Sequence, residues 1–343
     1  MTSKVFFKRL TTGNTAELSG AARALLERLV AEENHVFAKQ VPLKVHFGEA
    51  GNTTFVPPSC YDGVIDYLEE HHVGTAFIET NVLYRGARTT EESHRRVAAE
   101  HGFTRIPVII ADGAIGTDYS EIPIHKEFID TCKIGIKYAD YDQFLVMSHF
   151  KGHDSAGFGG ALKQLSMGFA ARGGKLEQHS GLTPIVNEEK CVSCGQCVSK
   201  CGYDAIALFP PEKAHILTEQ CVGCAGCIAV CPIGAIYSRW DGNNLLEKIA
   251  EYAYGAQLGK DNIYISFAIN ITKSCDCLGE HMIPVAGDVG VFASKNPVAL
   301  DTACLDMLQH NAHEPLFDFG RRTLEHAVKI GFARDRYDLI HVD

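Results

Sequence analysis

Two runs of closely spaced cysteines carry the strongest chemical signal in this sequence. They read Cys191-x-x-Cys194-x-x-Cys197-x-x-x-Cys201 and Cys221-x-x-Cys224-x-x-Cys227-x-x-x-Cys231-Pro232. A C-x-x-C-x-x-C loop curls back on itself and presents three thiolates to one cubane cluster, while the fourth cysteine of each run ligates the other cluster. The spacing therefore predicts two [4Fe–4S] clusters and one-electron chemistry.

This shared ligation assigns four cysteines to each cluster. The first set is Cys191, Cys194, Cys197 and Cys231, and the second set is Cys221, Cys224, Cys227 and Cys201. An Ala-Ile pair follows each fourth cysteine, so the runs form an internal repeat, and we expect each pair to pack against a cluster. Residues 184–240 closely resemble a two-cluster ferredoxin. The alternatives fit less well, because disulfides need an oxidising compartment and zinc sites use paired C-x-x-C units.

Composition restricts the class of protein. The chain has 343 residues, a formal net charge of −10 and no block of basic residues, which argues against nucleic acid as a partner. No apolar run approaches the ~18 residues of a membrane span. The first residues lack the apolar stretch of a signal peptide. We expect a cytoplasmic protein with no membrane partner, in an organism tolerant of, or restricted to, low oxygen.

Short apolar strands alternate with amphipathic helices along the chain, which predicts an α/β body with a mostly parallel sheet. The expected strands cover residues 5–10, 41–47, 75–79, 107–111, 144–147, 263–271, 289–293 and 339–340. The expected helices cover residues 21–33, 61–72, 91–101, 245–258 and 297–309. The ferredoxin-like α+β domain at 184–240 is then an insertion between a first part of the body, 1–183, and a second part, 241–343.

Histidines and lysines gather after the buried strand 144–147. The candidate catalytic residues are His149, Lys151, His153, Lys163 and His179. The carboxyl end of such a strand is where α/β folds bind ligands. The glycine-rich turn before residue 161 opens a helix whose N–H groups are expected to face an anion. A small anionic substrate is therefore the expected ligand.

A second candidate site is Cys275-Asp276-Cys277, which follows the strand 263–271. In extended chain the two thiols point to the same side, so that they can bind one soft metal ion or react together. An additional metal ion at this pair is the resulting prediction. Asp301, farther on, is expected to be an exposed helix residue.

Polar side chains also follow two other predicted strands. Lys44 and His46 share one face at the end of the strand 41–47, and Glu49 falls in the following turn. Five more residues come after the strand 75–79: Asn81, Tyr84, Arg85, Arg88 and His94. Since the carboxyl ends of parallel strands meet at one edge of the sheet, these residues predict a polar cleft.

Several segments together resemble the DUF362 family, a domain of unknown function that is often fused to a ferredoxin unit. They are KVHFGEAGN, TNVLYRGARTTEESHRRVAAEHGF, SHFKGHDSAGFGGALKQLSMG, SCDC and ASKNPVALD, running from about residue 44 to 301. The resemblance implies an iron–sulfur protein with an associated metal or redox site.

The stretch His153-x-x-Ala156-Gly157-Phe158-x-Gly160-x-x-Lys163 is also similar to the core motif of nickel-pincer lactate racemases. This resemblance implies that His153 is an acid/base, that Lys163 carries the pincer cofactor and that His179 ligates nickel. Two features depart from that family: an arginine that precedes the lysine there is replaced by Leu162, and the family has no ferredoxin unit.

Three functions stay open at this level. The leading hypothesis is a redox enzyme, in which two clusters relay single electrons from a redox partner protein to the polar site in the body. The first alternative is a non-enzymatic electron carrier or cluster-delivery module. The second is a hydroxy-acid isomerase or racemase with a pincer-like metal cofactor. A further alternative is that the two clusters have a structural role alone.

Overall fold

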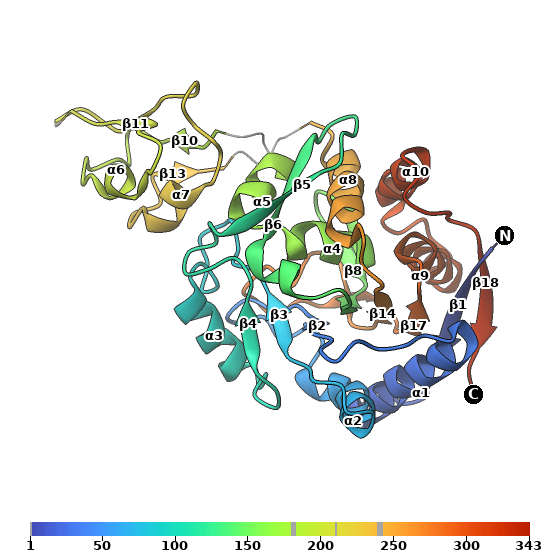
Figure 1. Ribbon diagram of the computed structural model, residues 1–343. Helices are drawn as coiled ribbons and strands as arrows, with labels where there is room; N and C mark the ends of the chain where they lie inside the picture. Colours follow the sequence, from blue (N-terminus) through green and yellow to red (C-terminus); the bar gives the residue numbers. More distant parts are fainter. Residues whose placement is uncertain (1, 180–182, 210, 239–242) are drawn as a thin grey trace.

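The computed structural model describes residues 2–179, 183–209, 211–238 and 243–343, and an eight-stranded sheet forms the centre of this part of the chain (Figure 1). The strand order is β18-β1-β17-β14-β7-β2-β3-β4. The strands are β1 (Ser3–Lys8), β2 (Leu43–Lys44), β3 (Phe77–Glu79), β4 (Val108–Ile110), β7 (Leu145–His149), β14 (Ile263–Ala268), β17 (Gly290–Ser294) and β18 (Tyr337–His341). Only β17 runs antiparallel to its neighbours in this sheet, so the prediction of a mostly parallel α/β body is confirmed.

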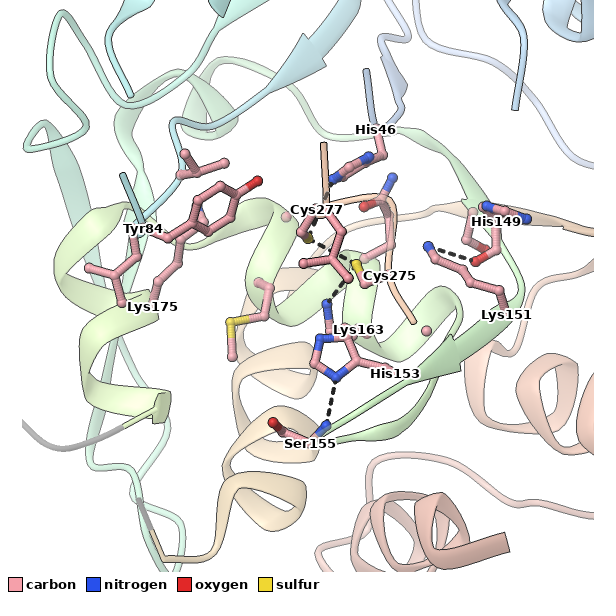
Figure 2. A pocket seen from close by; sticks show the side chains of 18 of the residues that line it. His46, Tyr84, His149, Lys151, His153, Ser155, Lys163, Lys175, Cys275 and Cys277 are labelled. Atoms are coloured by element: carbon pink, nitrogen blue, oxygen red, sulfur yellow. Dashed lines mark hydrogen bonds between the residues drawn. The ribbon is translucent and has the colours of Figure 1, made fainter. Parts of the chain in front are cut away.

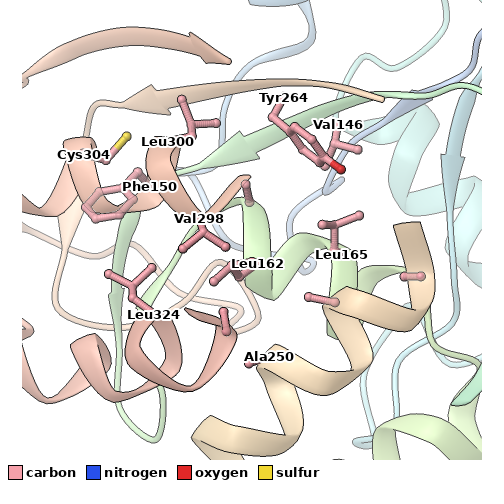
Figure 3. Close-up of a cluster of buried hydrophobic side chains, with 14 of the residues drawn as sticks. Val146, Phe150, Leu162, Leu165, Ala250, Tyr264, Val298, Leu300, Cys304 and Leu324 are labelled. Atoms are coloured by element: carbon pink, nitrogen blue, oxygen red, sulfur yellow. The ribbon is translucent and has the colours of Figure 1, made fainter. Parts of the chain in front are cut away.

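Helices cover both faces of the sheet. The first face carries α1 (Thr15–Glu33), α2 (Asp62–Glu70) and α3 (Glu91–Glu100). The other face carries α4 (Ala161–Phe169), α8 (Leu245–Gln257), α9 (Pro297–Ala312) and α10 (Arg321–Lys329). Strand residues alternate between the two cores, since Phe6 packs on the first face and Val5 and Phe7 on the other. Figure 3 shows the second core, where Leu162, Leu165, Val298 and Leu324 meet.

Local signals explain where the helices begin. The Asn296 side chain accepts hydrogen bonds from Val298 N and Ala299 N at the start of α9, and Pro297 occupies its first turn. The Asn14 side chain caps α1, which starts six residues before the predicted position. The predicted strand 41–47 keeps only Leu43–Lys44 in the ladder.

Three hairpins were absent from the prediction, because their strands are short and carry few apolar residues. They are β5 (Tyr119–Pro123) with β6 (Thr131–Gly135), β8 (Lys151–His153) with β9 (Gly157–Gly159), and β15 (Ile271–Thr272) with β16 (Pro284–Ala286). The expected glycine-rich strand-to-helix turn is thus the β8–β9 hairpin. Short 3₁₀ helices occupy Pro58–Tyr61, Ile136–Asp140 and Asp318–Gly320.

The cysteine-rich segment has a small core of its own and stands beside the body in Figure 1. It contains α6 (Gln196–Lys200), α7 (Gly226–Val230), and the strand pairs β10 (Ile185–Val186) with β13 (Ile236–Tyr237) and β11 (Ile206–Ala207) with β12 (His215–Ile216). The predicted domain boundary after residue 240 and the expected loop residue Pro210 lie outside the described residues. Among the helices of the described residues, none has both the length and the apolar character needed to cross a membrane.

Candidate redox site

A cavity of about 550 Å³ opens at the carboxyl ends of β2, β3 and β7, where the sequence predicted a polar cleft. Its walls come from segments far apart in the chain, and Figure 2 shows their side chains pointing into it. The polar and thiol-bearing lining residues include His46, Glu79, Tyr84, Arg88, His149, Lys151, His153, Lys163, Gln164, Lys175, His179, Cys275 and Cys277. All seven residues predicted for the catalytic and metal roles in the body therefore lie around one cavity.

The thiols of Cys275 and Cys277 lie side by side in the cavity wall. Their sulfur atoms are 2.9 Å apart, with Lys163 Nζ 3.9 Å from the Cys275 sulfur and His46 Nε2 3.9 Å from the Cys277 sulfur (Figure 2). The hydrogen bond from Cys277 lowers the pKa of Cys275 well below its ordinary value, and the ammonium groups of Lys163 and Lys151 act in the same direction. The same hydrogen bond, together with burial, raises the pKa of Cys277. Both shifts act in the same sense, favouring the thiolate at Cys275 and the thiol at Cys277.

This arrangement does not match chelation of one ion by both sulfurs. Two thiolates about 2.3 Å from one tetrahedral metal ion are about 3.8 Å apart, well beyond the 2.9 Å between Cys275 and Cys277. In the described residues, no group of three or more His, Cys, Asp or Glu side chains is arranged around a position for a single ion. The additional metal ion stays a prediction.

Asp276 lies between the two cysteines and anchors their loop. Its carboxylate is fully buried, 2.9 and 3.1 Å from His149 Nδ1 and 3.0 Å from Lys151 Nζ. Burial opposes ionisation of Asp276, but attraction to His149 and Lys151 outweighs it and holds the pKa well below the ordinary value. His149 Nε2 donates to the Ile269 carbonyl at 2.7 Å. His149 thus links the Asp276 carboxylate to the Ile269 carbonyl and holds the loop in place.

His153, Lys163 and His179 line the other side of the cavity. His153 Nδ1 accepts hydrogen bonds from the N–H groups of Ser155 and Ala156 at the β8–β9 turn, which leaves Nε2 as the protonated nitrogen of the neutral ring. Burial and the Lys163 ammonium lower the pKa of His153 well below its ordinary value, and they lower that of His179 to about 3. Both rings are therefore neutral near pH 7 and stand beside a cation.

The prediction that α4 directs its N–H groups at an external anion is wrong. Asp301, expected on the surface, is fully buried in α9 and accepts hydrogen bonds from Ala161 N at 2.7 Å and Leu162 N at 2.9 Å. A carboxylate of the chain itself thus satisfies the first turn of α4. An anionic ligand must instead be bound by side chains of the cavity.

The other predicted cleft residues divide into two groups. His46, Tyr84 and Arg88 line the cavity. The remaining five do not line it, and each has another partner in the structure. Lys44 forms an ion pair with Glu79 at 2.9 Å, and Glu49 forms one with Arg88 at 3.4 Å. Asn81 donates a hydrogen bond to Asp112, Arg85 donates one to the Pro232 carbonyl, and His94 packs against Phe47.

Sequence reasoning missed Lys175, which lies in the cavity wall on α5 (Arg172–His179). Burial lowers its pKa to about 8, against the attraction of Asp112. The helix escaped prediction because Gly173-Gly174 disfavours helix. Both glycines are needed for close packing, since a Cβ on Gly173 would lie 2.6 Å from the Gly223 carbonyl oxygen and one on Gly174 would lie 2.7 Å from that of Lys133.

The predicted crossed sets of cysteines line two separate small cavities in the cysteine-rich segment. One is lined by Cys191, Cys194, Cys197 and Cys231, together with Ala235 and Ile236. The other is lined by Cys201, Cys221, Cys224 and Cys227, together with Ala205 and Ile206. The fourth cysteine of each run thus stands with the three cysteines of the other run, as cubane ligation requires.

The backbone repeats as the sequence does. Ser193, Gly195 and Asp204 have positive φ angles, and so do Gly223, Ala225 and Gly234, which lie 30 residues later. Positive φ is uncommon for serine and alanine, so both loops are curled tightly about their cavities. Four thiols, an apolar lining and curled loops fit a cubane in each cavity.

The loop of the second set packs directly on the body. Gly223 approaches Gly173 of α5, and Lys133 Nζ donates to the Val222 carbonyl at 3.0 Å. Ala225 packs with Leu83 and Leu176. Leu83 also lines the large cavity, as do Lys175 and His179 of α5. The second cysteine set is therefore the inner one, and α5 lies between it and the large cavity. In the first set Cys194 is exposed.

The chain was compared with protein families, with curated proteins and with solved structures. The family model described as a domain of unknown function, DUF362, matches residues 41–306. No protein with a curated description matches the sequence.

Two solved structures show a low similarity to the chain. One is a protein from Thermotoga maritima, with 10% sequence identity and a TM-score of 0.41, over 92% of this chain and 58% of that one. The other is the lactate racemase apoprotein from Thermoanaerobacterium thermosaccharolyticum, with 12% identity and a TM-score of 0.36, over 78% and 51%. The chain thus spans little more than half the length of either structure, and neither likeness bears on function.

Proposed function

The chain belongs to the DUF362 family, as its segments predicted, and we propose that it is an iron–sulfur oxidoreductase. In this proposal two [4Fe–4S] clusters pass single electrons from a redox partner protein to the cavity that holds Cys275 and Cys277. The observation that carries the proposal is the separation of the eight ferredoxin-like cysteines into two crossed sets, one beside the body and one at the surface.

The order of the two sets gives the proposal a direction. The outer set has an exposed cysteine, Cys194, and exposed apolar neighbours, with Val192 63% and Phe209 71% exposed. Such a surface suits transient docking of a redox partner protein. The inner set lies against α5 and Leu83, which also border the cavity. Electrons are therefore proposed to enter at the outer set and leave from the inner one.

The cavity residues have separate roles in this proposal. Lys163 and Lys175 provide positive charge for a small anionic substrate. The neutral rings of His153 and His46 are placed to move protons at the substrate and at Cys277. When bound, the clusters supply one electron at a time. Because Arg88 and Lys151 are paired with buried carboxylates, Lys163 and Lys175 are the better anion ligands.

Anaerobic purification tests the clusters directly. Iron, acid-labile sulfide, nickel, zinc and copper are measured per chain, and the reduced protein is examined by EPR, where two interacting cubanes are expected. Cys194→Ser is expected to lose iron, whereas Cys60→Ala, which changes a lone cysteine of the body core, is the matched control. A colourless protein without labile sulfide contradicts the proposal.

A second set of variants separates an enzyme from an electron carrier. His153→Ala and Lys163→Ala change the cavity without touching the cysteine-rich segment. If the protein is an enzyme, both variants lose cellular function and keep their iron. If both are silent while Cys194→Ser is not, the protein is an electron carrier or a cluster-delivery module.

One observation favours the second candidate, a hydroxy-acid isomerase or racemase. His153, Lys163 and His179, which the motif resemblance singles out, line the same cavity. Stoichiometric nickel and an added mass on Lys163 in the intact protein are the expected signs of this function. Iron and sulfide alone count against it.

A further inference from the structure

The separation of the two sulfur atoms in Cys275-Asp276-Cys277 is suited to a bond between them. At 2.9 Å it lies between the about 2.05 Å of a disulfide and the about 3.8 Å of two thiolates on one tetrahedral ion. Closing the bond needs a sulfur movement of less than about 1 Å, by the same comparison. The two side chains already face one another (Figure 2).

The loop that carries the pair is held rigidly. The Asp276 carboxylate is bound by His149 and Lys151, and its carbonyl accepts a hydrogen bond from Glu49 N at 3.0 Å. Leu278 N donates to the Cys275 carbonyl at 3.0 Å, which closes a turn across the pair. The sulfurs are therefore kept close by the fold, and this favours bond formation between them over reaction with a distant thiol.

Charged and proton-carrying groups stand at opposite ends of the pair. The partner that the structure gives to the Lys163 ammonium is the Cys275 sulfur, at 3.9 Å, and the His46 ring lies 3.9 Å from the Cys277 sulfur. A cation beside Cys275 stabilises a thiolate there, and an imidazole beside Cys277 can give or take its proton. The surroundings thus suit an open form with one thiolate and one thiol.

We propose that Cys275 and Cys277 form a redox-active pair that closes to a disulfide and stores two electrons when it opens. Opening breaks the sulfur–sulfur bond with two electrons and one proton: Cys275 becomes the thiolate beside Lys163, and Cys277 takes the proton. The two electrons come singly from two reduced iron–sulfur clusters, a source that rests on the proposed function. Closing reverses the step: the sulfur–sulfur bond forms again, Cys277 releases its proton, and the two electrons return singly to the two oxidised clusters.

The test uses the purified full-length protein with its clusters, kept under argon. Samples are equilibrated with mixtures of reduced and oxidised dithiothreitol, quenched with acid and an alkylating agent, and digested with trypsin. Residues 274–295 form one tryptic peptide, and Cys275 and Cys277 are its only cysteines. Mass spectrometry is expected to show this peptide doubly alkylated under reducing conditions and unalkylated with an internal disulfide under oxidising ones. The peptide with Cys304, a lone buried thiol, is the internal control.

Lys163→Met tests the role of the neighbouring charge. The Lys163 ammonium stabilises the Cys275 thiolate of the open, reduced form. Because the stability of the reduced form sets the reduction potential of a disulfide, loss of this cation makes the disulfide harder to open. The equilibrium constant for opening is expected to fall at least about tenfold, which corresponds to about 30 mV for two electrons. Lys126→Met, which alters a lysine bound to the Ile330 carbonyl far along the chain, is the control and leaves the constant unchanged.

Two results overturn the inference. One is a peptide that stays doubly alkylated over the whole range of dithiothreitol mixtures. The other is one zinc, copper or nickel ion per chain that is lost in both Cys275→Ser and Cys277→Ser, since this shows a metal chelate. Iron and sulfide are measured on the same samples: a pair that opens and closes in a protein without clusters supports the inference and contradicts the proposed electron source.

Discussion

Replacement of Asp276 by asparagine removes the buried charge that anchors the Cys275–Cys277 loop. The Lys151 ammonium lies 3.0 Å from this carboxylate, and its side chain is only 8% exposed. With an effective dielectric constant of about 20, two charges at this distance attract by about 5.5 kcal/mol. Loss of one partner of a buried pair costs about 3–5 kcal/mol, because the remaining charge stays buried without compensation. We expect Asp276→Asn to destabilise the body by an amount in this range.

The assay combines urea unfolding, followed by far-UV circular dichroism under argon, with hydrogen exchange of peptides that cover residues 145–153 and 271–279. Asp154→Asn is the matched control, because this exposed aspartate binds the same loop through Ser274 Oγ at 2.9 Å. Its expected effect is within about 0.5 kcal/mol, as for surface substitutions in general. If Asp276→Asn differs from Asp154→Asn by less than about 0.5 kcal/mol and exchange in both peptides is unchanged, the anchoring role of Asp276 is wrong.

Three further predictions concern other parts of the chain. Cys231→Ser removes a proposed ligand of the outer cluster, so about half of the iron is expected to be lost while the EPR signal of the inner cluster persists. Gly173→Ala places a Cβ 2.6 Å from the Gly223 carbonyl oxygen, so dithionite-reduced clusters are expected to open the proposed disulfide more slowly at unchanged iron content. His35 has a pKa lowered to about 4 by burial and by Lys295, so the folded protein holds fewer protons than the unfolded chain between pH 6.5 and 4. The free energy of unfolding contributed by His35 therefore falls as the pH drops through this window, by at most about 1.4 kcal/mol per pH unit. In urea unfolding, His35→Asn is expected to show a smaller dependence of the unfolding free energy on pH.

Each of these experiments has a result that opposes it. If Cys231→Ser loses both EPR signals and its circular dichroism spectrum shows an unfolded protein, the crossed assignment is tested with Cys201→Ser instead. That variant must lose the EPR signal of the inner cluster and keep that of the outer cluster. Gly20→Ala, a change on α1 with nothing within 4 Å of the new Cβ, is the control for Gly173→Ala, and equal rates in the two contradict the contact. An unchanged slope in His35→Asn contradicts the assigned titration.

Much of the fold follows from local pattern. Apolar periodicity predicted the central strands and the helices α1, α2, α3, α8 and α9, because burial of one face needs only a regular spacing of apolar residues. Short hairpins such as β8–β9 were not predicted, since three-residue strands contain too few residues for a periodic signal. The helix α5 escaped because its glycines oppose helix locally and are required only by contacts with the rest of the molecule.

Candidate residues could be found from strand ends, but their roles could not. His149 and Asp301 show the difference. The sequence offered His149 as a catalytic candidate, and the structure shows its ring nitrogens bonded to Asp276 and Ile269, more than 100 residues away. It marked Asp301 as exposed, yet this carboxylate is buried at the start of α4. Each role depends on a partner that no local pattern identifies.

The sequence by itself determined the two cysteine sets and the Cys-x-Cys pair, since ligand spacing within a curled loop and the direction of neighbouring side chains are properties of a few consecutive residues. Only the tertiary structure decided that the second set faces the body, that α5 stands between it and the cavity, and that Lys163 and His46 flank the two thiols. Those contacts join residues far apart in the chain, and they exist only after both faces of the sheet have been covered.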